Sequence, residues 1–267
     1  MPRFAANLSM LFPERPFADR FGAAARAGFR AVECQFPYEL SAETLADRLA
    51  AHGLSMVLHN LPAGDWAAGE RGLACRPDRR DDFQTGLEQA IAYANRLNCP
   101  TLNCLAGLRP SDLDPAEATA TLVANLKLAA TELKKAGIAL VVEAINTRDV
   151  PGFFLNCTDQ ALALIEAVGA DNLFVQYDAY HMQIMEGDLA PTLSRLKDRG
   201  LLRHVQIADT PGRFEPGTGE INFPFLFGHL DRIGYDGWVG CEYRPAGATL
   251  AGLEWLAPYQ PTLKVPA

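Results

Sequence analysis

Four polar side chains stand at or near the ends of four consecutive apolar stretches in the second half of the sequence. They are Glu143, Asp178, Gln206 and Glu242. A buried strand that ends in a polar residue is typical of a strand whose carboxyl end opens onto a functional site. A lone carboxylate at such a place is better explained by a pair with an arginine or by a loop cap. Four polar residues on consecutive strands instead favour a shared site.

Three carboxylates packed in one place would repel each other and shift each other's pKa values unless a cation neutralised them. Neighbouring strands lie about 4.8 Å apart, so four adjacent strand ends can converge on one ion. Oxygen ligands suit Mg²⁺ or Mn²⁺ better than zinc. The sequence therefore predicts a divalent-metal site formed by Glu143, Asp178, Gln206 and Glu242.

Two histidines lie close to the ends of predicted strands. His181 follows Asp178 by three residues, and His59 lies at the end of an earlier apolar stretch, beside Asn60. Either could be an ordinary loop residue, but beside a strand-end site each becomes a candidate substrate ligand. Asn7, which ends the first stretch, is a further candidate. The remaining histidines are expected to be structural: His52, His204 and His229.

Two loops carry further candidates for substrate binding. Arg213 precedes a glycine-rich turn at residues 215–222, and an arginine there could hold a substrate carboxylate by two parallel hydrogen bonds. The segment from 61 to about 80 is long and glycine-rich, and loops of this length are commonly lids or binding loops. Its Trp66, Glu70 and Arg71 could close over a substrate or could form a self-packed surface loop.

Strand and helix patterns alternate along the whole sequence. Apolar stretches predict strands at 3–7, 31–36, 55–60, 100–105, 138–143, 173–178, 203–209 and 238–243. Helical spacing and caps, including Ser41 and Thr158 as N-caps, predict helices at 16–28, 41–53, 82–97, 115–136, 159–168, 189–199, 223–233 and 249–256. Eight such units predict an α/β fold with a closed (β/α)8 TIM barrel. An open doubly wound sheet is disfavoured because neither G-x-G-x-x-G nor a P-loop is present, and no nucleotide cofactor is expected.

Length and charge limit the classes of function. At 267 residues, one barrel domain spanning 1–267 is expected, with a loosely packed tail from about residue 257. The net charge of -8 disfavours binding to nucleic acid. No stretch approaches the roughly 20 apolar residues of a membrane span. Scattered cysteines without Cys-x-x-Cys spacing suit a reducing, cytoplasmic setting. Self-association into a homo-oligomer stays open.

Several blocks of the chain resemble the hydroxypyruvate isomerase family of xylose-isomerase-like TIM barrels. The blocks are FAANLSMLF (4–12), LHNLPAGDWAAGERG (58–72), QYDAYHMQ (176–183), QIAD (206–209), EPGTGEIN (215–222) and GWVGCEY (237–243). The 58–72 block is specific to this family, whereas the glutamates and the Asp-x-x-His element are shared by the wider group. The resemblance spans nearly the full chain.

The resemblance implies reversible isomerisation of hydroxypyruvate to 2-hydroxy-3-oxopropanoate through an enediolate. Glu143 and Glu242 match the acid/base pair of the family, and with Asp178 and Gln206 they match the metal site of the wider group. Sugar-active relatives commonly have histidine where this chain has Gln206. An amide oxygen is a weaker ligand, which predicts weaker metal binding. His181 would position the substrate hydroxyl, and Arg213 the substrate carboxylate.

Other activities on the same barrel are alternatives. The nearest is isomerisation of a four-carbon acid, 2-oxotetronate, because pocket walls rather than motifs set the substrate length. A metal-dependent lyase and a non-catalytic sugar-acid binder are further options. An apurinic endonuclease is disfavoured, since it needs more histidine ligands and a basic face.

Overall fold

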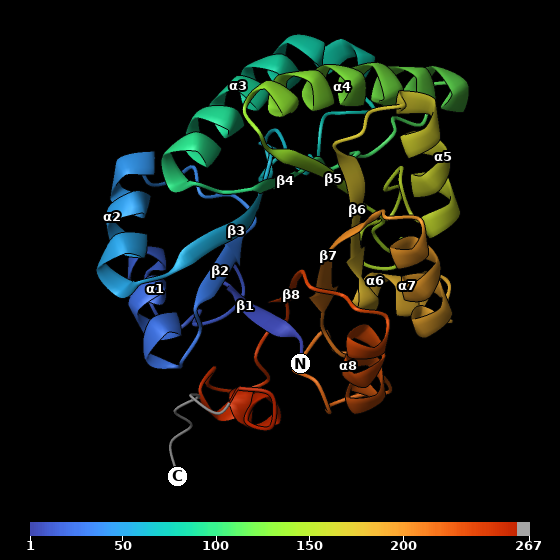
Figure 1. The fold of residues 1–267 in the computed structure, drawn as a ribbon. Coiled ribbons are helices and arrows are strands. Elements are labelled where there is room, and N and C mark those ends of the chain that lie inside the picture. Colours follow the sequence, from blue (N-terminus) through green and yellow to red (C-terminus); the bar gives the residue numbers. More distant parts are fainter. Residues whose placement is uncertain (261–267) are drawn as a thin grey trace.

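Eight parallel strands close into a barrel in sequence order, with helices around the outside (Figure 1). This computed structural model describes residues 1–260. The strands are β1 (Arg3–Asn7), β2 (Ala31–Cys34), β3 (Ser55–Asn60), β4 (Thr101–Asn103), β5 (Ala139–Glu143), β6 (Leu173–Asp178), β7 (Leu202–Ile207) and β8 (Trp238–Cys241). Pairing of β8 with β1 closes the ring, and Gly240 lies opposite Ala5. The predicted (β/α)8 barrel is confirmed.

Helices connect successive strands and cover the outer face of the barrel. They are α1 (Phe17–Arg26), α2 (Ala42–His52), α3 (Arg80–Leu97), α4 (Pro115–Lys135), α5 (Thr158–Val168), α6 (Ala179–Met185), α7 (Leu189–Asp198) and α8 (Phe223–Arg232). Two 3-10 helices are η1 (Pro77–Arg79) and η2 (Ala251–Leu256). The predicted cap at Ser41 is confirmed, because its side chain accepts a hydrogen bond from the Thr44 N–H.

Three local predictions differ from the structure. The helix expected at 249–256 is the 3-10 helix η2. The short helix α6 was not expected, and it directly follows β6 because the Asp178 carboxylate caps it by accepting from the Tyr180 N–H. Thr158 is the first residue of α5 rather than its N-cap, and its hydroxyl donates to Glu186 at 2.7 Å.

Alternate residues of each strand share a face, and this rule decides which side chains enter the barrel. A small apolar cluster that is separate from the main core includes Ala5, Ala31 and Val141. Two residues further along β1 and β5 come Asn7 and Glu143, which the same alternation directs to the interior at the carboxyl end. The larger apolar core packs between the strands and the surrounding helices.

The chain ends are tied to the barrel as far as the structure describes them. Tyr259 packs on Phe4 and Phe227, with ring centroids 5.9 and 5.0 Å apart. The remainder of the tail that was expected to pack loosely, residues 261–267, lies outside the described residues. Among residues 1–260, no helix combines the length and apolar character needed to cross a bilayer.

Candidate active site

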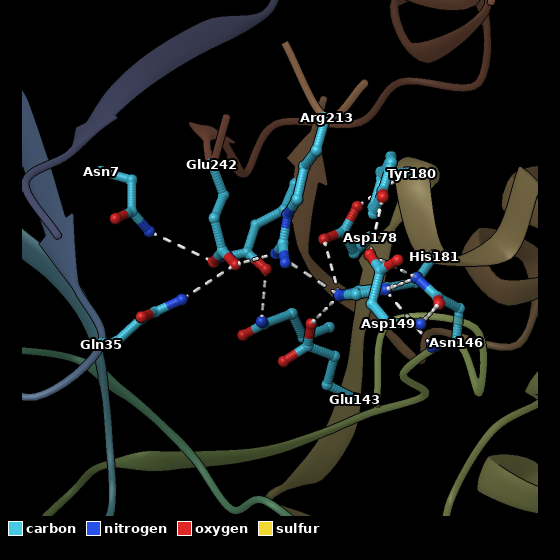
Figure 2. Close-up of polar contacts among 12 residues, drawn as sticks. Asn7, Gln35, Glu143, Asn146, Asp149, Asp178, Tyr180, His181, Arg213 and Glu242 are labelled. Atoms are coloured by element: carbon cyan, nitrogen blue, oxygen red, sulfur yellow. Dashed lines mark hydrogen bonds and ion pairs between the residues drawn. The ribbon is translucent and has the colours of Figure 1, made fainter. Parts of the chain in front are cut away.

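A cavity of about 930 Å³ opens at the carboxyl ends of the strands. Glu143, His181, Arg213 and Glu242 all line it, and they come from four successive units of the barrel. Figure 2 shows these side chains pointing toward one another across the barrel mouth. This is the face of a TIM barrel on which active sites lie.

Glu143, Asp178 and His181 form the most compact group in the cavity. Each offers a ligand atom within 4.8 Å of the others. His181 Nε2 lies 3.6 Å from Asp178 Oδ2 and 3.8 Å from Glu143 Oε1. Asn103 donates to the other oxygen of Glu143 at 2.9 Å.

Asn146 determines which nitrogen of His181 carries the proton. Its backbone N–H and its side-chain amide both donate to His181 Nδ1, at 3.3 and 2.7 Å. The amide orientation is set in turn because its oxygen accepts from the Asp149 N–H at 2.7 Å. Neutral His181 therefore carries its proton on Nε2, where it serves as a hydrogen-bond donor into the cavity.

Arg213 is paired with Glu242 at 2.6 Å, and both side chains are largely buried. Its Nε has no hydrogen-bond partner among residues 1–260. The guanidinium also lies over the Tyr180 ring, 5.1 Å from the centroid. Tyr180 is held by a hydrogen bond to Asp149 at 2.6 Å.

Amide side chains surround Glu242 from below. Gln206 donates to Glu242 Oε2 at 2.6 Å, Asn7 donates to the same oxygen at 3.2 Å, and Gln35 donates to Oε1 at 3.1 Å. Figure 2 shows the amides of Asn7 and Gln35 pointing toward Glu242. These amides fix the position of the carboxylate without neutralising its charge.

Burial governs the ionisation of the acidic groups. It raises the pKa of Glu143 well above its ordinary value, and the charges of Glu242 and Asp178 add to the shift. Burial raises the pKa of Glu242 to about 8 although Arg213 opposes the change. The pKa of Asp178 rises to about 6 for the same reason, again against Arg213.

The two cationic side chains respond in opposite directions. Burial and the charge of Arg213 lower the pKa of His181 well below its ordinary value, so the imidazole is neutral at physiological pH. Burial would lower the pKa of Arg213, but Glu242, Asp178 and Glu143 outweigh that effect and raise it. One buried guanidinium thus faces three buried carboxyl groups.

The acidic group fits a divalent cation. Asp178 Oδ2 is buried and has no hydrogen-bond partner among the described residues, although an acceptor oxygen ordinarily finds one. It lies beside Glu143, whose pKa is raised partly by that proximity. A cation between the two carboxylates would satisfy the unpaired oxygen and remove the repulsion.

Gln206 is placed differently from the role expected for it. Its NH₂ group donates to Glu33 at 2.8 Å and to Glu242, so the nitrogen must face the two carboxylates. Its oxygen accepts from Gln176 at 2.5 Å, deeper in the barrel. The oxygen that would bind a metal is therefore directed away from Glu143 and Asp178, and its role as a ligand stays a prediction.

The other predicted substrate ligands divide into two groups. Trp66 and Arg71 lie on the cavity wall. His59 and Glu70 do not line the cavity. His59 is fully buried against Tyr38. Glu70 accepts a hydrogen bond from the Asp65 N–H at 2.6 Å and pairs with Arg79. Asn7 lies beneath the cavity floor, where it holds Glu242.

A buried centre below the cavity was missed in the sequence. Glu33 of β2 is fully buried and accepts hydrogen bonds from Asn7, Gln206 and His204, the last at 2.6 Å. A single carboxylate inside the short apolar stretch 31–34 was the available signal. Asn103, which ends β4 as Asn7 ends β1, could have been found by the strand-end rule applied to the other residues.

Residues 21–259 match the family model described as xylose isomerase-like TIM barrel. The chain belongs to this family. It is 52% identical over 259 residues to 2-oxo-tetronate isomerase of Cupriavidus necator, covering 97% of this chain and 99% of that protein. It is also 52% identical over 260 residues to hydroxypyruvate isomerase of Escherichia coli, covering 97% and 100%.

Two solved structures agree with the barrel. A protein from Brucella melitensis described as AP endonuclease, family 2, has a TM-score of 0.94 and 46% identity, covering 97% of this chain and 100% of that one. An L-ribulose 3-epimerase structure has a TM-score of 0.75 at 27% identity, covering 92% and 82%. The resemblance expected from the sequence blocks is confirmed at the level of the family.

Proposed function

We propose that the protein isomerises hydroxypyruvate and 2-hydroxy-3-oxopropanoate by proton transfer between Glu242 and Glu143. The observation that carries this proposal is the pair of buried glutamates that line one cavity, only one of which has an arginine partner. The Escherichia coli relative, named hydroxypyruvate isomerase, supports the substrate. A small hydroxy or oxo acid is thus the expected ligand of the cavity.

Different environments suit the two glutamates to different steps. Arg213 makes Glu242 the more readily ionised of the two glutamates, so Glu242 acts as the base and takes a proton from C3 of hydroxypyruvate. The electron pair moves into an enediolate across C3 and C2. Glu143, whose raised pKa favours the protonated form, delivers a proton to C2. The hydroxyl proton passes from O3 to O2, which leaves an aldehyde at C3 and a hydroxyl at C2.

His181 and Arg213 stabilise the charge that develops between these steps. The Nε2–H of His181 donates to the oxygen at C2, where negative charge accumulates. Asn146 keeps this donor in place by occupying Nδ1. Arg213 Nη2 lies 3.5 Å from His181 Nε2, so its positive charge adds to the stabilisation of the same negative charge.

Glu143 and Asp178 would hold a divalent cation, with Glu242 as a further oxygen ligand. Magnesium or manganese suits such an oxygen-rich set. When bound, the cation supplies positive charge that lowers the energy of the enediolate. Among the residues predicted as ligands, Gln206 instead positions Glu242 through its NH₂ group.

Substitution of each glutamate tests the proposed division of work. Glu242→Gln should lower both the turnover rate and the rate at which the C3 hydrogens exchange with D₂O, each by at least about 100-fold. Glu143→Gln should abolish turnover to a similar degree while retaining measurable C3 exchange, because the enediolate still forms. Proton NMR in D₂O measures both quantities. Near-native turnover in both variants would end the proposal, and the reverse exchange pattern would interchange the two roles.

A second candidate is isomerisation of 2-oxotetronate to 3-oxotetronate. It is favoured by the equally similar relative from Cupriavidus necator, which is named 2-oxo-tetronate isomerase. The same groups would act on C3 and C2 of a substrate that is one carbon longer. The ratio of kcat/KM for the two acids decides between these substrates.

A further inference from the structure

We propose that Arg71, supported by the indole ring of Trp66, binds the substrate carboxylate and makes the site selective for acids over neutral sugars. This inference rests on the proposed isomerase function and concerns the same cavity. It also changes the assignment made from the sequence, in which Arg213 was expected to bind the carboxylate.

The guanidinium of Arg71 is held in place on the cavity wall. Its Cζ lies 4.0 Å from the centroid of the Trp66 ring, and Trp66 packs in turn on Phe36 at 5.2 Å. Its Nη1 donates to the carbonyl oxygens of Trp66 and Glu70 at 3.0 and 2.7 Å. An arginine ordered in this way loses little freedom when it binds an anion.

One edge of the guanidinium remains available. Within residues 1–260, Nε and Nη2 of Arg71 make no hydrogen bond, and Arg71 forms no ion pair in that range. The adjacent carboxylate of Glu70 is bound instead to Arg79 and to the Asp65 N–H. Arg71 therefore presents an uncompensated charge and two parallel donors, which is the arrangement that binds a carboxylate.

The other two arginines of the cavity are less suited to this role. Arg213 already pairs with Glu242 at 2.6 Å, so a substrate carboxylate would have to compete with a buried partner. Arg244 lines the cavity but is exposed, and its side chain makes no hydrogen bond within the described part of the chain. Ordering it on a ligand would cost side-chain entropy that Arg71 has already lost.

A neutral analogue of the substrate separates binding of the carboxylate from the chemistry. Dihydroxyacetone is hydroxypyruvate with a hydroxymethyl group in place of the carboxylate, and erythrulose stands in the same relation to 2-oxotetronate. Arg71→Gln should lower kcat/KM for the acids by about 100-fold, mainly through KM, because a charge-assisted bidentate contact is lost. Turnover or C–H exchange of the neutral analogues should change by less than about 3-fold. Arg71→Lys, which keeps the charge but not the fork, should give an intermediate loss.

The matched control is Arg76→Gln, five residues further along the same segment. Arg76 pairs with Asp78 at 2.6 Å and does not line the cavity, so acid and neutral substrates should both be unaffected. Equal losses for acid and neutral substrates in Arg71→Gln would overturn the inference. The inference would also be overturned if Arg244→Gln lost the selectivity for acids over neutral analogues while Arg71→Gln retained it. If the unmodified protein isomerises no acid at all, the proposed function itself fails.

Discussion

Buried titratable side chains in this barrel differ in the ion-pair and hydrogen-bond partners around them. Glu242 has an arginine and three amide donors, whereas Asp178 has one backbone donor and an unpaired oxygen. His59 is fully buried behind the barrel wall, where Nδ1 contacts the Tyr38 hydroxyl and Nε2 has no partner among the described residues. Only the Asn60 carbonyl oxygen, 3.2 Å from Nδ1, favours the charged form of this histidine among the described residues, and burial outweighs it. His59 therefore affects stability rather than chemistry.

His59 should make the protein sensitive to mild acid. Burial lowers its pKa from 6.5 to about 4 in the folded state, so the folded state favours neutral imidazole. The associated stability is fully present above pH 6.5 and is lost as the pH falls from 6.5 toward 4. Between pH 7 and 5 this loss amounts to about 2 kcal/mol.

Urea unfolding of the unmodified protein and of His59→Gln measures this effect. The free energy of unfolding of the variant should fall by about 2 kcal/mol less between pH 7 and 5. His181 also has a lowered pKa, but it is present in both proteins and cancels in the difference. Parallel pH profiles for the two proteins would contradict the assignment to His59.

At the scale of elements, the loop from 61 to 76 is anchored by backbone contacts. Gly72 donates to the Ala63 carbonyl at 3.0 Å, and Cys75 donates to the Ala106 carbonyl at 2.9 Å. A Cβ at Gly72 would lie 2.5 Å from the Leu105 carbonyl oxygen, so only glycine permits this approach. These contacts fix the segment that carries Trp66 and Arg71 against the β4 unit.

Gly72→Ala should therefore displace the binding segment. Both Gly72 and Gly69 have positive φ, but a Cβ at Gly69 would meet nothing within 4 Å. Gly69→Ala should cost about 1 kcal/mol of stability and little activity. Gly72→Ala also places a side chain at positive φ, and its Cβ collides with the Leu105 carbonyl oxygen, so kcat/KM for the acid should fall by at least about 10-fold. Steady-state kinetics and thermal unfolding test the pair, and equal effects in both variants would argue against a positioning role for the loop.

Long periodic elements were predictable from the sequence, and short ones were not. The eight strands followed from apolar runs with polar ends, and the predicted long helices lie within a few residues of their observed bounds. α6 was missed because seven residues provide less than two full helical turns of pattern. It depends on Asp178, whose place at a strand end was read only as a ligand position. At 249–256, helical spacing did not distinguish an α-helix from the tighter η2.

At the scale of the whole molecule, closure of the barrel brings together residues that are far apart in the chain. Strand-end position correctly predicted that Glu143, Asp178 and Glu242 lie close together, because parallel strands share one carboxyl edge, whereas their roles stay a prediction. The orientation of a side chain could not be predicted from the sequence where it depends on a partner across the barrel. Gln206 presents its nitrogen because Glu33, 173 residues away, accepts from it. Arg213 follows β7 and meets Glu242 at the end of the neighbouring strand β8, so the pairing of these two strands brings the two side chains together.

Burying the Asp178 carboxylate in this site has a cost in stability. The pKa of Asp178 rises from 3.8 to about 6 on folding, so the folded state disfavours its ionised form. The raised value means that stability present below pH 3.8 is lost as the pH rises through 6, and the loss at pH 8 is about 3 kcal/mol. A cation that binds the folded state alone would restore stability in proportion to its affinity.

Asp178→Asn should consequently stabilise the metal-free protein while removing its response to metal. The amide oxygen can still cap α6 by accepting from Tyr180, and no charge remains to be buried. In EDTA at pH 8 the free energy of unfolding should rise by up to about 3 kcal/mol. Added Mn²⁺ should stabilise the unmodified protein and have much less effect on the variant.

The control is the same substitution at Asp209, a buried carboxylate whose oxygens accept hydrogen bonds from four backbone N–H groups. The donors are those of Thr210, Gly217, Gly219 and Ile221, at 2.9–3.0 Å. Asp209→Asn sets an NH₂ group against these donors and should destabilise by about 1–3 kcal/mol with or without metal. If Asp178→Asn raises the free energy of unfolding and Asp209→Asn lowers it, the gain at position 178 is due to removal of its unpaired charge. A destabilised Asp178→Asn in EDTA, or equal Mn²⁺ stabilisation of both proteins, would refute this account of the acidic cluster.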